Sequence, residues 1–153
     1  MFVCYYSGTV HVGREKNVAT ERDHITEIDL MDQDHDRFFS RIQWFEERIK
    51  KATDCTQADT LKEMFDCIEK HIFVHFTEEE ILHQKYQYPH AVLHNNMHSQ
   101  FKNMFFNLNG RLEREGTSSM FIQYAKDTVT DWMTTHVKEL DQSFCEFLRR
   151  RNA

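Results

Sequence analysis

The sequence has very little glycine and proline, with four Gly and one Pro in 153 residues. Folds rich in turns and loops need more of both, because these residues supply the backbone angles that tight turns require. Their scarcity favours long helices joined by short connections. We therefore predict an all-α protein.

Other absences disfavour several classes of protein. No apolar run approaches the length of a membrane span, so we expect no transmembrane segment and a cytoplasmic location. No basic stripe offsets the net charge of −6, which argues against nucleic acid as a partner. The four cysteines are scattered without a C-x-x-C pair, which indicates free thiols in a reducing compartment rather than a zinc ribbon or redox pair.

The chain does contain enough apolar material for one well-packed domain, since 40% of its residues are hydrophobic. Residues 1–30 show no sustained period and are predicted to form an N-terminal arm. Within residues 31–151, four stretches carry apolar residues at steps of 3 and 4, as amphipathic helices do. We expect an up-down-up-down antiparallel four-helix bundle, with helices over 32–51, over 59–87, from Pro89 to an end at Asn109-Gly110, and from 119 towards the C-terminus.

Two pairs of metal-competent side chains stand on either side of the predicted break between the second and third helices. His75 and Glu79 are four residues apart, and so are His94 and His98. Residues four apart project from one face of a helix, so each pair points in one direction. Imidazole and carboxylate together suit first-row transition metals, iron and zinc among them.

Polar residues also interrupt the apolar seams of these helices. His35 lies on the seam of the first helix and His136 on that of the last. Glu79 is the informative case, because a carboxylate on a buried seam is costly unless it is paired or bound to a metal. His71 and His83 fall off the seam of the second helix, so we expect them to be exposed or peripheral.

His136 and Asp141 are five residues apart in the last helix, which places them about 140° from each other on a regular helix. One metal could not easily take both side chains from such a helix. Either a widened turn brings them together, or they flank a site larger than one ion.

The candidate ligands are five histidines and two carboxylates: His35, His75, Glu79, His94, His98, His136 and Asp141. Seven ligands exceed the four that zinc normally takes. Two octahedral ions that share both carboxylates and a small solvent-derived bridge would use all of them. One coordination position would stay open for a small ligand.

The motifs that carry these residues resemble those of the hemerythrin family. They are M-D-Q-D-H-D-R-F-F with His35, H-F-T-E-E at 75–79, Y-P-H-A-V-L-H-N-N-M-H-S-Q-F at 88–101 and W-M-T-T-H-V-K-E-L-D at 132–141. The resemblance covers roughly residues 28–147, and the expected residue type stands at all seven ligand positions.

The resemblance implies two non-haem iron ions with a bridging oxo or hydroxo group, and reversible binding of dioxygen at one of them. His35 and His75 would hold the iron that stays open, and Glu79 and Asp141 would bridge the pair. The other iron would be saturated by His94, His98 and His136. The protein would act as an oxygen or redox sensor domain or as an oxygen carrier, and the domain itself would not be an enzyme.

Bacterial members of the family are often fused to signalling output domains. We therefore expect that an output domain or signalling partner could attach through the C-terminal helix. Sensor and carrier both stay open at this point. One departure from the family pattern bears on the choice: Lys138 and Glu139 stand where an apolar residue often helps to line the oxygen pocket. If either reaches the pocket, faster autoxidation would favour sensing over storage.

Two other classes are weaker alternatives. A di-iron oxidase, peroxidase or iron-handling protein in the same bundle usually has a carboxylate-rich set of ligands with Glu-x-x-His pairs. Five histidines against two carboxylates leave fewer anionic groups to stabilise high-valent iron. A histidine-rich metal store or a purely structural bundle is disfavoured, because seven polar residues on core seams would be costly without a metal.

Overall fold

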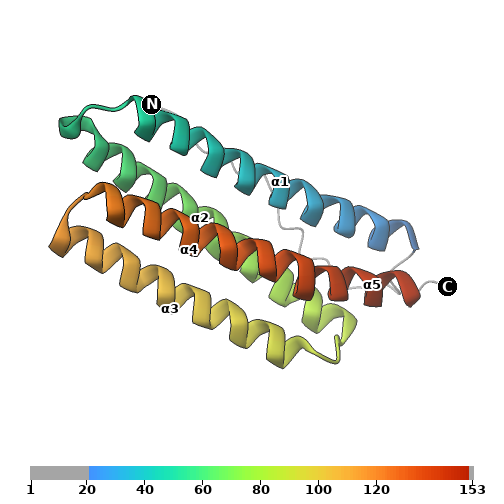
Figure 1. Ribbon diagram of the computed structural model, residues 1–153. Coiled ribbons are helices and arrows are strands. Elements are labelled where there is room, and N and C mark those ends of the chain that lie inside the picture. The colour runs from blue at the N-terminus through green and yellow to red at the C-terminus, as the bar shows by residue number, and fades with distance from the viewer. Residues whose placement is uncertain (1–20, 152–153) are drawn as a thin grey trace.

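The computed structural model describes residues 21–151, without the side chains of residues 21–26, 54–55 and 115. All regular structure in this part of the chain is helical: α1 (Glu21–Lys51), α2 (Asp54–Tyr86), α3 (Ala91–Glu115), α4 (Ser119–His136), the π-helical turn η1 (Val137–Asp141) and α5 (Gln142–Arg150). Figure 1 shows α1 to α4 side by side along their length, with α5 continuing the line of α4. The all-α prediction is confirmed. Among the described residues, no helix has the length and apolar character that crossing a membrane requires.

α1 begins at Glu21 rather than near Asp32 as predicted. Ile28 and Met31 are both buried and continue the seam of the first helix backwards in steps of 3 and 4 from His35. The apolar pattern therefore extends into the segment that was predicted to be an arm. Residues 1–20, the rest of that predicted arm, lie outside the described residues.

The ends of α2 and α3 also differ from the prediction. α2 begins at Asp54 rather than near residue 59, and α3 continues past Gly110 to Glu115. Leu112 is buried against the core, so packing holds this last stretch of α3 despite the glycine within it. The helix ends instead at Gly116, whose φ of 71° suits a residue without a side chain.

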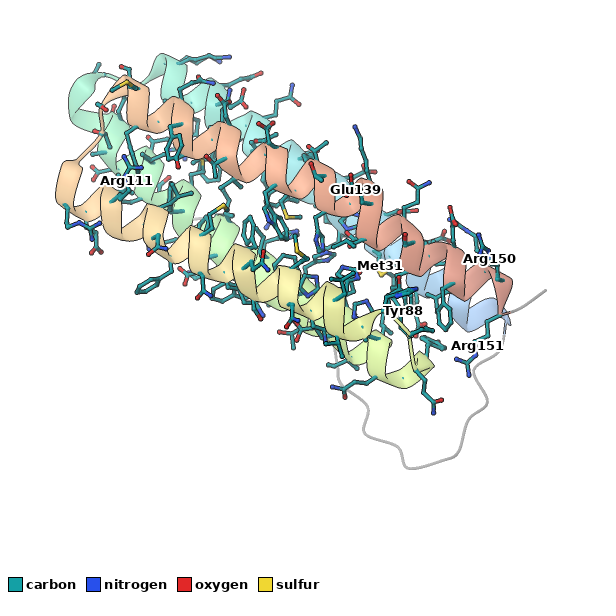
Figure 2. All side chains as sticks on the ribbon, turned by 60° about the horizontal axis from the view of Figure 1, so that its bottom comes forward. Met31, Tyr88, Arg111, Glu139, Arg150 and Arg151 are labelled. Atoms are coloured by element: carbon teal, nitrogen blue, oxygen red, sulfur yellow. The ribbon has the colours of Figure 1, made fainter. Side chains whose placement is uncertain are left out.

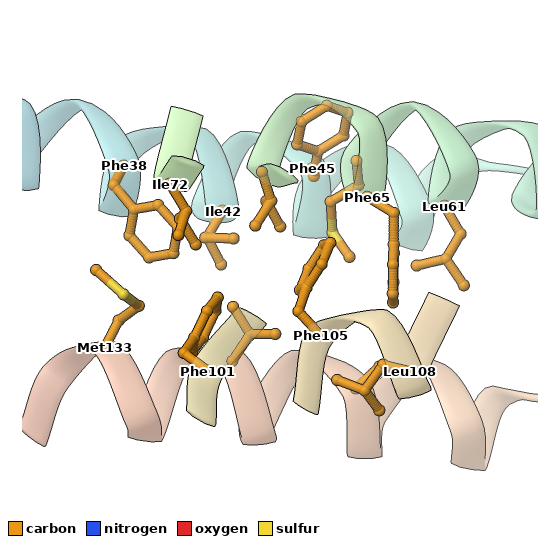
Figure 3. Close-up of a cluster of buried hydrophobic side chains, with 14 of the residues drawn as sticks. Phe38, Ile42, Phe45, Leu61, Phe65, Ile72, Phe101, Phe105, Leu108 and Met133 are labelled. Carbon is orange, nitrogen blue, oxygen red and sulfur yellow. The ribbon is translucent and has the colours of Figure 1, made fainter. Parts of the chain in front are cut away.

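Two clusters of buried hydrophobic side chains fill the interior. Figure 3 shows part of the larger one, where side chains from α1, α2, α3 and α4 point towards one another, among them Phe38, Phe65, Phe101, Phe105 and Met133. The smaller cluster lies near the start of α1 and within α5, and it contains Ile28, Met31, Tyr86, Tyr88, Phe144, Cys145 and Leu148. Along the helices, the predicted ligands fall between members of the two clusters. Apolar packing therefore borders them on both sides.

Steps of 3 and 4 from Phe121 and Ala125 to His136 predict a seam through Thr128 and Trp132, and the buried face of α4 differs from it by one residue. The structure buries Val129 and Met133, whereas Thr128 and Trp132 are only partly buried. Trp132 instead stacks on the ring of His136, with 4.5 Å between ring centroids and 16° between planes. The tryptophan thus forms a side wall of the polar centre, and its other contacts are with the apolar core, Phe101 among them.

Candidate metal centre

The structure brings all seven predicted ligand side chains together in the interior, and all of them are buried. They form two groups, and within each group the candidate ligand atoms lie within 4.8 Å of one another. The first group contains Glu79, His94, His98 and His136, and the second contains His35, His75 and Asp141. Either group could hold a metal ion.

Ring nitrogens converge in the first group. The Nε2 atom of His136 lies 3.0 Å from that of His94 and 3.0 Å from that of His98. The Nε2 atom of His98 is also 3.1 Å from Oε2 of Glu79. Since a ring nitrogen carries at most one hydrogen, hydrogen bonds alone cannot satisfy all these close contacts. A cation among these atoms would.

Asp141 connects the two groups. Its Oδ2 lies 2.9 Å from Nε2 of His35, whereas its Oδ1 lies 3.0 Å from Nε2 of His94 and 3.1 Å from Nε2 of His136. The π-helical turn Val137–Asp141 places His136 and Asp141 at one site despite their five-residue spacing. The widened turn, one of the two alternatives that the sequence left open, is confirmed.

Two carboxylates outside the predicted set orient two of the histidines. The Nδ1 atom of His75 is 3.3 Å from Oδ2 of Asp34, and the Nδ1 atom of His98 is 3.0 Å from Oε1 of Glu80. A hydrogen on Nδ1 would be donated to the carboxylate and leave Nε2 with a lone pair that faces the centre. This pairing of carboxylate, imidazole and cation is characteristic of histidines that bind metals.

The two buried carboxylates have pKa values displaced in opposite directions. Burial and the nearby charge of Asp141 raise the pKa of Glu79 well above its usual range. Burial would also raise the pKa of Asp141, but its contacts with His136 and His35 outweigh this and hold it well below its usual range. Without a cation, the centre therefore favours a proton on Glu79 and a negative charge on Asp141.

Burial favours the neutral form of two of the imidazoles, His98 and His136. It lowers the pKa of His98 and of His136, and the charges of neighbouring histidines act in the same direction. A neutral imidazole has the lone pair that a metal requires. Several buried atoms of the centre also lack a well-oriented hydrogen-bond partner among the described residues: Nε2 of His35 and His75 and both oxygens of Glu79 and Asp141. Unsatisfied donor atoms of these types fit a pair of transition-metal ions.

Two histidines that were expected to be exposed or peripheral are in fact buried, so that prediction was wrong. His71 is 5% exposed and His83 is 1% exposed. His71 lies beside Asp34, and His83 lies beside Asn95. Both Leu82 and His83 follow Glu79 at a helical step, of three and four residues respectively. The four-residue step, which also separates His75 from Glu79, could have predicted the burial of His83.

A cavity of about 490 Å³ lies beside the centre, between α3 and the α4–η1 segment. Its walls are mostly apolar, and it is lined by Leu93, Met97, Met104, Thr128, Asp131, Trp132, Thr135, His136, Glu139 and Leu140. Glu139 therefore reaches a cavity that touches the predicted ligand His136, whereas Lys138 is not among the lining residues. Figure 2 places Glu139 along the bundle between Arg111 near one end and Arg151 near the other.

Comparison with known proteins identifies one family. Its sequence profile, described as the Hemerythrin HHE cation binding domain, matches residues 26–148. The family resemblance in the four motifs is thereby confirmed. Comparisons with curated proteins and with solved structures give no match.

Proposed function

Since the chain belongs to the hemerythrin HHE cation-binding domain family, we propose that it is a non-haem di-iron protein that binds dioxygen reversibly. The family match and two adjoining groups of buried histidines and carboxylates support this proposal. The proposal includes the up-down-up-down antiparallel course of the helices, which short connections at 52–53, 87–90 and 116–118 favour.

The observation that carries the proposal is the position of Asp141. One of its oxygens faces His35 in one group and the other faces His94 and His136 in the second group. A carboxylate in this position suits a bridge between two cations. Glu79, whose Oε2 faces His98, is proposed as the second bridge. A centre for a single cation would not need a carboxylate divided between two sets of histidines.

The remaining ligands are assigned by group. One iron would be held by His94, His98 and His136, and the other by His35 and His75, which leave it an open position. When bound, the iron pair would supply that position and the electrons for reversible binding of dioxygen. Asp34 and Glu80 would orient His75 and His98 through their Nδ1 atoms. The fully buried ring of Phe76, stacked 3.9 Å from the ring of His98, would exclude water.

Oxygen or redox sensing is favoured over oxygen carriage by the position of Glu139. Glu139 adds a carboxylate, beside that of Asp131, to the wall of a mostly apolar cavity, and such a group attracts water to the neighbourhood of the centre. Water and negative charge there would shorten the life of the oxygenated protein, which suits a sensor better than a store. An output domain or signalling partner reached through the C-terminal helix belongs to the same proposal. A di-iron oxidase or peroxidase is not favoured by the histidine-rich set of ligands.

Metal stoichiometry tests the proposed centre. Ferrous iron is titrated without oxygen into the parent protein, into His136→Leu and into the matched control His90→Leu, whose histidine is exposed. We expect two irons per chain in the parent and in the control, and fewer than two in His136→Leu, because a convergent ligand is lost. One iron or none in the parent, or two irons in His136→Leu, would contradict the proposed ligand set.

A further inference from the structure

His83 is a buried histidine next to the metal centre that does not belong to the proposed ligand set. It lies on α2 one turn after Glu79 and is 1% exposed. The rings of Tyr88 and Phe144 pack against it, with centroids 5.2 and 4.5 Å from its own. A polar ring in such an apolar setting needs a partner for each nitrogen.

One nitrogen of His83 has a clear partner. Its Nδ1 lies 2.7 Å from Oδ1, the side-chain oxygen, of Asn95, which is the residue after His94 on α3. The other nitrogen, Nε2, has no hydrogen-bond partner among the described residues. The nearest charged atom that it faces is Oε1 of Glu79, at 3.9 Å.

The carboxylate of Glu79 therefore lies between His83 on one side and His94 and His98 on the other. Its Oε2 is directed to His98 and His94, at 3.1 and 3.6 Å, and its Oε1 is directed to His83. A neutral imidazole has one hydrogen-bond donor and one acceptor. The oxygen and nitrogen of an asparagine amide are told apart by the hydrogen bonds around them, so the amide can be turned to exchange the two. With the Asn95 amide turned so that its nitrogen, in place of Oδ1, donates to Nδ1, the hydrogen of His83 resides on Nε2 and faces Oε1 across 3.9 Å.

We propose that His83, held by Asn95, is a positioning residue for the carboxylate of Glu79 and thereby strengthens metal binding, an inference that rests on the metal centre proposed above. Holding Oε1 fixes the plane of the carboxylate, so that Oε2 keeps its place beside His98 and His94. Partners of this kind around a metal site contribute about 10- to 100-fold to metal affinity. A purely structural His83 would contribute packing alone.

The test compares affinities for ferrous iron, measured without oxygen by competition with a coloured chelator. His83→Leu keeps the bulk and removes the donor, whereas His83→Gln keeps an N–H group that can reach Oε1. The packing control is Phe144→Leu, which alters the apolar wall of His83 and leaves its nitrogens in place. Urea unfolding of each metal-free variant measures the structural effect separately.

We expect His83→Leu to weaken iron binding about 10- to 100-fold, with partial recovery in His83→Gln. Phe144→Leu should lower the free energy of unfolding and leave iron affinity close to that of the parent. Parental affinity in His83→Leu, or an equal loss in Phe144→Leu, would overturn the inference. If the parent itself binds no iron, the proposed function fails and this inference fails with it. If the parent binds two irons and His83→Leu binds them equally tightly, only this inference fails.

Asn95 provides a second test that does not depend on the folding of His83→Leu. Asn95→Ala leaves His83 in place but removes the amide that orients its ring. We expect weaker iron binding than in the parent, and a double variant with His83→Leu that binds no more weakly than His83→Leu alone, because both act through one chain of contacts. Fully additive losses, or parental affinity in Asn95→Ala, would contradict a shared role.

Discussion

At the scale of single residues, the feature that matters most is a set of buried polar atoms at the centre. The oxygens of Glu79 and Asp141 lie in an interior that offers them few well-oriented hydrogen bonds. Desolvation of such atoms is costly unless they are paired or bind a cation. Asp34 and Glu80 lie beside the Nδ1 atoms of His75 and His98, which suits rings whose Nε2 atoms face the centre. The arrangement is that of a site prepared for positive charge.

The sequence could predict which residues meet in the centre, but not which residues support them. Side chains that fall on one face of a helix can be recognised in the sequence by their spacing of three or four residues. Asp34 is adjacent to His35 in sequence and has no such signature, so only its contact with α2 identifies it. His83 was missed because the seam of α2 can be continued through either Leu82 or His83 after Glu79.

The first prediction at this scale concerns Glu139. Replacing it by leucine should slow the autoxidation of the oxygenated protein several-fold, because the cavity beside the centre loses a charged group that attracts water. The decay of the oxygenated spectrum measures the rate. Glu113→Leu, which alters an exposed glutamate of α3, is the control and should decay like the parent. Equal autoxidation rates in Glu139→Leu and the parent would show that Glu139 does not influence autoxidation.

At the scale of elements, the type and order of the helices followed from the sequence, while their ends did not. Asn109-Gly110 is typical of a helix end, yet α3 continues to Glu115 because the burial of Leu112 outweighs the low helix propensity of Gly110. The widened turn η1 was only one of two alternatives, since the spacing of His136 and Asp141 does not show how the chain accommodates the extra residue.

The N-terminus of α4 supplies a prediction about stability. The hydroxyl oxygen of Ser118 accepts a hydrogen bond from the backbone N–H of Phe121 at 3.1 Å. Ser118→Ala should lower the free energy of unfolding by about 1 kcal/mol, because this N–H loses its capping partner. Urea unfolding of the metal-free protein measures the change. Thr117→Ala, one residue before the cap, should have a much smaller effect, and equal effects of the two would argue against the cap.

At the scale of the whole molecule, two apolar clusters border one polar centre. The larger is built on side chains such as Phe65 and Phe105, and the smaller on side chains such as Tyr88 and Phe144. Apolar packing can therefore stabilise the fold on both sides of the centre. Without metal, the centre itself contains buried polar atoms that lack hydrogen-bond partners. Metal binding should add to this stability, because ions that bind only the folded chain shift the folding equilibrium.

The buried histidines predict the pH dependence of the metal-free protein. Burial lowers the pKa of His83 from 6.5 to about 4 and also lowers the pKa of His98 and His136. Below about pH 6.5 the unfolded chain therefore binds more protons at these histidines than the folded protein does, so the free energy of unfolding should fall as pH falls from about 6.5 to about 4. Glu78 and Glu79, whose pKa values are raised, act in the opposite direction, whereas His71, whose pKa is also lowered by burial, acts with the other histidines.

Urea unfolding at about pH 5 and about pH 7.5 checks this dependence. The metal-free parent should be less stable at the lower pH, and His83→Leu should show a smaller difference because one of the buried histidines is gone. Equal stability of the parent at both values would contradict neutral burial of these rings.

The most direct test of the central claim is the visible absorption spectrum of the reduced, iron-loaded protein before and after oxygen is admitted. The account predicts that colourless ferrous protein gains an oxygen-dependent charge-transfer band that fades on prompt removal of oxygen, and that this band converts readily to that of a stable ferric form when oxygen is left in place. The absence of any iron-dependent band would contradict the di-iron centre. It would leave a helical protein whose seven buried polar side chains serve no metal.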